Sequence, residues 1–305
     1  MGRLTTRDDP SGRPCLAYIM RRLLDYLALT KPIIMILLLM TTLAAMFVAS
    51  GGMPPLDLML WTMIGGALSS GGASALNQYI DRDLDGEMAR TAKRPIPSGK
   101  IQPTHALIFG LALSLLSVVV FLVFVNWVAA LMSLIGHLYY VVFYTLYLKR
   151  ATPQNIVIGG AAGAVPPLVG WAAATGEINL SALFLFAIIF YWTPPHFWAL
   201  ALVKRNDYAR GQIPMLPVVW GEGETRKQIV LYSLILVALT LLLTPANVTG
   251  KFYMIAAAVL GVILLVHAAM LMRGGTIAQA WRMYKYSSYY LALLFVAMVV
   301  DQFIY

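Results

Sequence analysis

The sequence has little cysteine and little charge, and both shortages exclude classes of protein. Cys15 is the single cysteine among 305 residues, which excludes a disulfide framework within the chain and a metal site built from cysteines. Charged residues make up 11% of the chain, whereas a soluble domain carries about 25%. Hydrophobic residues make up 60%, and the mean hydropathy is +0.76. We therefore predict an integral membrane protein.

Apolar segments of about 20 residues, long enough to cross a bilayer as helices, recur along the chain. They lie at about 33–50, 58–80, 104–125, 127–147, 154–174, 181–202, 229–245, 252–272 and 286–304. This pattern predicts an all-α fold, a polytopic bundle of nine transmembrane helices. Asn126 and Trp127 are nearly all that separates the third and fourth segments, which predicts a tight hairpin there. We expect residues 1–32 to form a cytoplasmic N-terminal leader and residues 33–305 to form the membrane domain.

The basic residues are distributed unequally between the two sets of connections. All except Lys251 lie in the N-terminal leader or in the connections after the second, fourth, sixth and eighth apolar segments. Such asymmetry is typical of cytoplasmic loops in membrane proteins. It predicts a multi-pass protein of the cell membrane with a cytoplasmic N-terminus and an external C-terminus. It also accounts for the net charge of +9 without binding to nucleic acid.

One polar stretch, NQYIDRDLDGEMARTAKRPIPSG at residues 77–99, follows an apolar run rich in small residues. Asn77, Asp81 and Asp85 are four residues apart, so on a helix their side chains share one face. Two carboxylates and an amide oxygen suit Mg²⁺, which usually takes one or two protein carboxylates together with water and substrate phosphate. Arg90 and Arg94 follow, and guanidinium groups match phosphate oxygens. These residues indicate a diphosphate site; the alternative is an ordinary solvated loop whose charges offset one another.

A second polar cluster lies at the end of the sixth apolar segment, in FYWTPPHFWALALVKRNDYARG. Pro194 and Pro195 are expected to interrupt or bend the helix. His196 follows them at membrane depth, between Trp192 and Trp198, and an ionisable side chain inside a membrane is expensive and usually functional. The imidazole could ligate haem iron, shuttle protons or bond a backbone carbonyl freed by the prolines, and a structural histidine is the remaining alternative.

Four further residues are weaker candidates. Asp207, near the membrane surface, is expected either to complete a metal site with Asp81 and Asp85 or to pair with a neighbouring cation. Lys31 and Lys149 lie on the side where a diphosphate would bind, although most lysines there extend to the interface. Tyr144 is expected near Lys149, or in the interfacial aromatic belt.

The chain resembles the UbiA-type intramembrane prenyltransferases, and within them most closely the branch that modifies haem. The likeness is carried by LTKP, the stretch 77–99, YTLYLKR, PPLVGWAAATG, YWTPPHFWALAL and DYARGQIPMLPVV, which span residues 29–219. In most of the superfamily a second aspartate-rich motif follows the sixth helix. Here His196 stands where its first acid is expected, and Asp207 remains among the later acids.

This resemblance implies nine helices around a central cavity, with Mg²⁺ held by Asn77, Asp81, Asp85 and Asp207. It implies that a farnesyl group passes from farnesyl diphosphate to a vinyl group of haem B, with addition of water, for the haem supply of terminal oxidases. Haem B is then a substrate, and haem-copper oxidase assembly factors are possible partners alongside the lipid bilayer. The residues expected to bind the diphosphate are Arg90, Arg94, Lys149, Lys31 and Tyr144, and those expected to bind haem are His196, Trp192 and Trp198.

Three other functions compete with this interpretation. A related prenyltransferase acting on a quinone precursor or a chlorophyll-type ring would be expected to keep the second aspartate-rich motif. A secondary transporter would place its acids in the middle of helices rather than at one membrane surface. A haem-binding assembly protein without catalytic activity would not need clustered aspartates and arginines.

Overall fold

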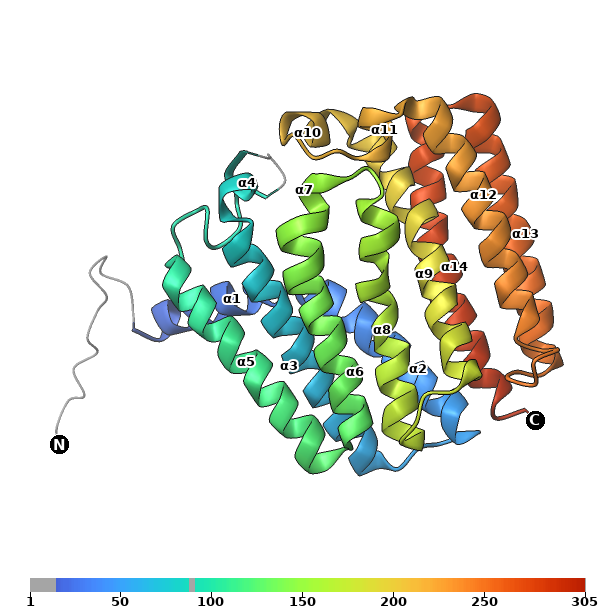
Figure 1. The fold of residues 1–305 in the computed structure, drawn as a ribbon, viewed down its shortest axis with the longest axis horizontal. Coiled ribbons are helices and arrows are strands. Elements are labelled where there is room, and N and C mark those ends of the chain that lie inside the picture. Colours follow the sequence, from blue (N-terminus) through green and yellow to red (C-terminus); the bar gives the residue numbers. More distant parts are fainter. Residues whose placement is uncertain (1–14, 88–90, 305) are drawn as a thin grey trace.

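The computed structural model describes residues 15–87 and 91–304, and throughout them all regular secondary structure is helical. Nine helical segments of 19 residues or more run side by side (Figure 1). They are α2 (Pro32–Ser50), α3 (Leu56–Ile80), α5 (Pro103–Phe124), α6 (Trp127–Leu138) continued by the π-helical turns η1 (Tyr139–Leu148), α8 (Asn155–Thr175), α9 (Leu180–Val203), α12 (Gly221–Leu242), α13 (Lys251–Gly274) and α14 (Ile277–Asp301). The predicted all-α membrane fold is confirmed.

Eight of these nine segments are also apolar enough to cross a membrane, within the part of the chain that the structure describes. The ninth, α3, is long enough but contains many glycine, serine and amide residues. Its small residues serve close packing. At Gly72, a Cβ atom would lie 2.9 Å from the carbonyl oxygen of Gly110 on α5. A less apolar helix is therefore still a full member of the bundle.

The short helices gather at one end of the bundle, where Figure 1 shows α4, α7, α10 and α11, while the C-terminus lies at the opposite end. They are α4 (Arg82–Glu87), α7 (Lys149–Ala151), α10 (Arg205–Arg210) and α11 (Leu216–Val219). The connections after the second, fourth and sixth long segments thus share one face, as the distribution of basic residues predicts. The expected hairpin also forms, because Asn126 caps α6 by accepting a hydrogen bond of 2.8 Å from the Ala129 amide.

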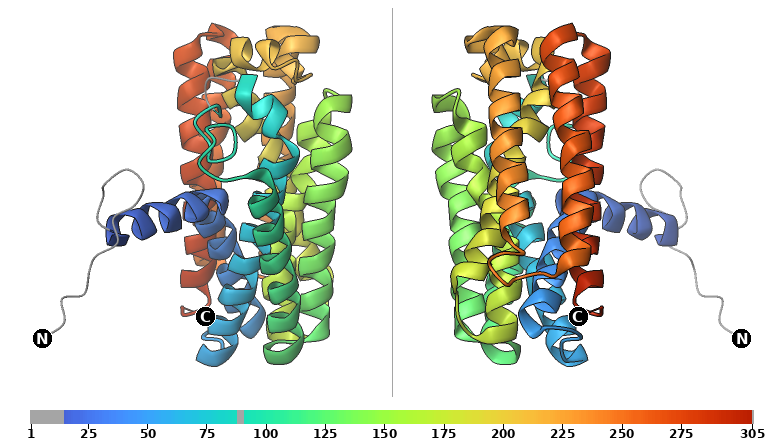
Figure 2. Two further views of the ribbon diagram at one scale, coloured as in Figure 1. Left: turned by 90° about the vertical axis from the view of Figure 1, so that its left-hand side faces the viewer. Right: turned by 90° about the vertical axis from the view of Figure 1, so that its right-hand side faces the viewer.

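Helix α1 (Cys15–Leu29) projects from the bundle across the direction of the long helices (Figure 2), and only its C-terminal end packs on the bundle, where the Tyr26 ring lies 5.1 Å from that of Phe109 on α5. It leaves the bundle part-way along its length. Met20, Leu23, Leu24 and Leu27 form an exposed apolar stripe at helical spacing. Such a helix is typical of the membrane interface, where an apolar face enters the lipid and polar side chains remain in water. The expected leader therefore contains a helix.

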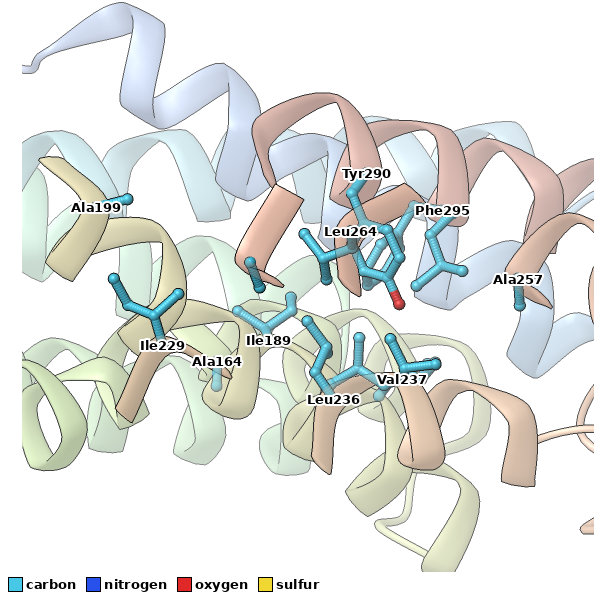
Figure 3. Close-up of a cluster of buried hydrophobic side chains, with 14 of the residues drawn as sticks. Ala164, Ile189, Ala199, Ile229, Leu236, Val237, Ala257, Leu264, Tyr290 and Phe295 are labelled. Atoms are coloured by element: carbon cyan, nitrogen blue, oxygen red, sulfur yellow. The ribbon is translucent and has the colours of Figure 1, made fainter. Parts of the chain in front are cut away.

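The second half of the bundle, α9 and α12–α14, has its own apolar core. Figure 3 shows Ile189, Leu236, Leu264 and Tyr290 pointing toward one another from these four helices. The Tyr290 hydroxyl donates a hydrogen bond of 3.2 Å to Thr240 Oγ1, so its polar end is also paired. Helices α8 and α2 join this half to the first, and α14 also packs against α2.

The proline pair does not interrupt its helix. Helix α9 continues from Leu180 through Pro194 and Pro195 to Val203. The two prolines lack the amide hydrogens that a helix normally uses, and neighbouring hydroxyl groups can bond the carbonyls that are left over. In the turn before the prolines, Thr193 Oγ1 donates a hydrogen bond of 2.8 Å to the carbonyl of Ile189, whereas the carbonyls that the prolines leave over are those of Phe190 and Tyr191.

Candidate active site

The three oxygen-bearing residues of the 77–99 stretch lie on one continuous face, as their spacing predicts. Asp81 ends α3 and Asp85 lies in α4, and backbone hydrogen bonds carry the helical course from one to the other: Asp81 N to Asn77 O at 2.9 Å and Asp85 N to Asp81 O at 2.8 Å. Asn77 Nδ2 donates to Asp81 Oδ2 at 2.8 Å. Asn77 is 4% exposed and the two aspartates are 0% exposed.

Three basic side chains contact this face: Arg94 from the same stretch, and Lys31 and Lys149 from distant parts of the chain. Lys149 Nζ lies 2.5 Å from Asp81 Oδ2, and Arg94 Nη1 donates to both oxygens of Asp85, at 2.8 and 2.6 Å. Lys31 Nζ donates to Asn77 Oδ1 at 2.7 Å. Buried carboxylates require such partners, because an unpaired buried charge is strongly destabilising. The structure therefore brings together six of the predicted residues in one cluster, which we call the acid–base cluster: Asn77, Asp81 and Asp85 with Lys31, Arg94 and Lys149 around them.

The acid–base cluster has more basic than acidic groups, with three basic side chains, Lys31, Arg94 and Lys149, beside two carboxylates. Lys31 lies at the corner between α1 and α2, where its backbone is left-handed with a φ of 51°. Burial, together with the nearby positive charges of Arg94 and Lys149, lowers the pKa of Lys31 to about 7. Such a cluster favours an anionic ligand, since an added negative charge would balance the excess.

Thr145 contacts the acid–base cluster, although it is not among the residues predicted for the site. Asn77 Nδ2 donates to Thr145 Oγ1 at 3.2 Å, and Thr145 Oγ1 donates to the carbonyl of Tyr140 at 2.8 Å. Its position four residues before Lys149 was the available signal. Tyr144, the residue selected from the sequence, lies instead on the neighbouring face: its ring stacks on Tyr140 with a centroid separation of 5.7 Å and packs against Gly159 of α8.

The predicted set also includes Arg90 and Asp207. Arg90 lies outside the described residues. Asp207 is on α10 and pairs with Arg210, one turn further along the same helix, at 3.3 Å. Among the described residues, no three histidine, cysteine, aspartate or glutamate side chains lie close enough to hold one metal ion. The structure thus does not bring Asp207 to Asp81 and Asp85, and the proposed cavity between them stays a prediction.

His196 lies in the seam between α9 and α14, enclosed by aromatic rings. Its ring stacks on Trp192 with a centroid separation of 4.3 Å and lies 4.6 Å from the ring of Tyr284. His196 Nδ1 and Ser287 Oγ are 2.8 Å apart, and Trp192 Nε1 donates to the Ser287 carbonyl at 2.7 Å. Four rings therefore follow one another along the seam, from Trp192 through His196 and Tyr284 to Trp281, and we call them the ring ladder.

Trp198 does not belong to the ring ladder. Its ring packs edge-on against Tyr232 of α12 at 5.3 Å, and the side chain is 1% exposed. Residues two apart in a helix are separated by about 200° of rotation about its axis. Trp198 and His196 therefore point in nearly opposite directions. His196 and Trp192 are therefore neighbours, whereas Trp198 faces α12, and binding of haem by these residues stays a prediction.

The comparisons with known proteins agree with this geometry at the level of the family. The chain belongs to the UbiA prenyltransferase family, whose sequence profile matches residues 38–297. Its fold resembles that of a solved digeranylgeranylglyceryl phosphate synthase, with a TM-score of 0.80 at 19% identity over 93% of this chain and 100% of that one. A UbiA homolog from Archaeoglobus fulgidus, solved with GPP and Mg²⁺, has a TM-score of 0.63 at 17% identity over 90% of this chain and 99% of that one.

Relatives of higher identity carry a particular name, protoheme IX farnesyltransferase. The protein of that name from Symbiobacterium thermophilum is 51% identical over 91% of this chain and 93% of its own length. The one from Roseiflexus sp. strain RS-1 is 51% identical over 96% of this chain but only 54% of its own length. The chain thus spans about half the length of some of the curated relatives it matches and nearly the whole of others.

Proposed function

We propose that this protein transfers the farnesyl group of farnesyl diphosphate to a vinyl group of protohaem IX, with addition of water, to give haem O. The acid–base cluster supports a diphosphate substrate, since it combines buried carboxylates with an excess of cations at the end of a membrane bundle. The identity of 51% along nearly all of the Symbiobacterium protein supports haem as the acceptor over a quinone precursor or a chlorophyll-type ring.

Asn77, Asp81 and Asp85 fit Mg²⁺, because hard oxygen donors at helical spacing match the one or two carboxylates this ion takes beside substrate phosphate. When bound, Mg²⁺ would supply positive charge to the departing diphosphate. Asp207 stays a further candidate for this role. The three basic side chains are within reach of the same place, so Arg94 and Lys149 would move from carboxylate oxygens, and Lys31 from the amide oxygen of Asn77, to phosphate oxygens as the substrate binds.

The reaction then begins with cleavage of the allylic C–O bond, whose electron pair leaves with the diphosphate. Lys31, Arg94 and Lys149 stabilise the negative charge that develops on the leaving group. Surrounding apolar helices keep water from the farnesyl cation, and aromatic faces favour positive charge. The vinyl π electrons form the new C–C bond. Water then adds to the cation beside the porphyrin and releases a proton, which leaves a hydroxyethylfarnesyl substituent.

One assay tests the proposal as a whole. Purified protein is incubated with haem B, farnesyl diphosphate and Mg²⁺, and the pigments are analysed by mass spectrometry. We expect a product whose mass equals haem B plus one farnesyl group and one hydroxyl group. Transfer of farnesyl to a quinone precursor but not to haem would assign the protein to the alternative acceptor class.

His196 is proposed to orient the haem, either through the iron or through its place in the ring ladder. We expect His196→Ala to weaken haem B binding at least about tenfold, a loss of about 1.4 kcal/mol, and to change the absorption spectrum of the bound haem. Trp198→Phe is the matched control, because Trp198 is equally buried on the same helix but faces α12. Titration of haem into both variants measures the effect, and an unchanged affinity and spectrum in His196→Ala would remove this residue from the haem site.

A further inference from the structure

A cavity of about 190 Å³ lies where the ends of α9, α12, α13 and α14 meet near α10. Leu202, Val203, Leu271 and Ala280 form apolar parts of its wall, and the remaining wall includes arginine, asparagine and threonine side chains. None of its lining residues belongs to the acid–base cluster. The cavity is therefore a second candidate site, separate from the one proposed for the diphosphate.

The charge of this cavity is positive. Arg205 Nη1 pairs with Glu222 Oε1 at 3.1 Å, which occupies the one acidic side chain of the wall. Arg226 donates from Nε to the backbone carbonyl of Glu222 at 3.2 Å, and among the described residues no carboxylate lies within ion-pair distance of its guanidinium group. The N-terminus of the 25-residue helix α14 adds partial positive charge at the mouth. Such a wall suits an anion.

The backbone also makes room for Arg226. Gly275 ends α13 in a left-handed conformation with a φ of 63°, and a Cβ atom there would collide with Arg226 Nη1. A side chain at this position would therefore push the guanidinium group out of its place. Guanidinium groups bind carboxylates with two parallel hydrogen bonds, which gives orientation as well as affinity.

The cavity continues the seam that holds the ring ladder. Val203 follows His196 by seven residues on α9, and Ala280 precedes Ser287 by seven residues on α14. At 1.5 Å per residue, both helices carry the cavity wall about 10 Å beyond His196. This offset is comparable with the reach from the centre of a porphyrin to the ends of its propionate side chains.

We propose that the cavity binds the carboxylates of the porphyrin acceptor, with Arg226 as the principal partner. This inference rests on the proposed function, because it takes an iron porphyrin as the acceptor. The flat macrocycle lies along the ring ladder, and its charged edge reaches the cavity. The carboxylates then fix which edge of the porphyrin, and so which vinyl group, faces the farnesyl donor.

The test compares haem B with its dimethyl ester, in which both carboxylates are methylated. Binding of each pigment is measured with wild-type protein, with Arg226→Ala and with the matched control Lys227→Ala. Lys227 is adjacent to Arg226 in the sequence but does not line the cavity. We expect wild type and the control to bind haem B at least about tenfold more tightly than the ester, the gain of a charge-assisted pair. In Arg226→Ala the two pigments should bind with nearly equal affinity, and Arg226→Lys should restore part of the difference.

Three outcomes would overturn the inference. If the Arg226→Ala variant still prefers haem B over its ester as strongly as wild type does, Arg226 does not bind the carboxylates. If Arg226→Ala weakens the binding of haem B and of its ester by the same factor, the role of Arg226 is structural, or its natural anion is a lipid phosphate. Both results leave the proposed function intact if wild type still farnesylates haem B, whereas a wild-type protein that neither binds nor converts haem would refute the function and the inference together.

Discussion

Asp81→Ala is expected to abolish turnover, with a fall in kcat of at least about 10³-fold. The Asp81 carboxylate is fully buried, bonded to both Asn77 and Lys149, and proposed as a magnesium ligand. Its removal would eliminate a metal ligand and leave Lys149 without its carboxylate. The measurement is the rate of formation of farnesylated haem by purified protein at saturating Mg²⁺.

Two controls separate loss of chemistry from loss of structure in this experiment. Asp83 is two residues away in the same segment but exposed, so Asp83→Ala should keep most of the activity. Breaking a buried ion pair costs about 3–5 kcal/mol, and Asp81→Asn, which keeps a hydrogen-bonding oxygen, tests whether the protein still folds. Full activity in either Asp81 variant, shown to be folded by its thermal midpoint, would remove Asp81 from the metal site.

Gly170→Ala is expected to destabilise the fold by about 3 kcal/mol or more, because the added methyl group has no space. A Cβ atom at position 170 of α8 would lie 2.1 Å from the carbonyl oxygen of Thr42 on α2, and a backbone oxygen inside a helix cannot move aside as a flexible side chain can. The effect should appear as a lower thermal midpoint in detergent and a smaller yield of folded protein.

The matched control for this prediction lies on the same helix. A Cβ atom at Gly163 would meet nothing within 4 Å, so Gly163→Ala adds the same methyl group without a clash. Alanine is favoured over glycine in a helix by about 1 kcal/mol, and this variant should be as stable as wild type or slightly more stable. Equal thermal midpoints in the two variants would mean that α2 and α8 do not pack this closely.

Much of the fold follows from apolar length and charge placement, which act along the chain and are visible in a sequence. The expected hairpin at Asn126 forms because few residues separate two spans. The expected clustering of Asn77, Asp81 and Asp85 forms because backbone hydrogen bonds extend the helical spacing past the end of α3. Residues at fixed spacing on one helix are therefore the part of the site that sequence reasoning places best.

Contacts between helices are harder to predict, because they depend on the rotation of each helix about its axis. Thr145 reaches Asn77 and Tyr144 does not, although the two are adjacent, since the wide turns of η1 decide which one points inward. Trp198 and His196 were grouped by nearness in the sequence and are separated by helix rotation. The position of the Asp207 side chain depends on where the short helix α10 packs, which neither hydropathy nor residue spacing predicts.

Helix α1 bears on how a substrate with a charged head and an apolar tail would bind. Its exposed stripe, with Leu23 and Leu27, suits a position flat at the boundary between headgroups and hydrocarbon. Lys31 lies at the corner where α1 turns into α2, so the acid–base cluster is near the same boundary. In the proposed reaction, a donor with a charged head and an apolar tail would then keep its head at the water boundary and its tail in the hydrocarbon while the bond between them breaks.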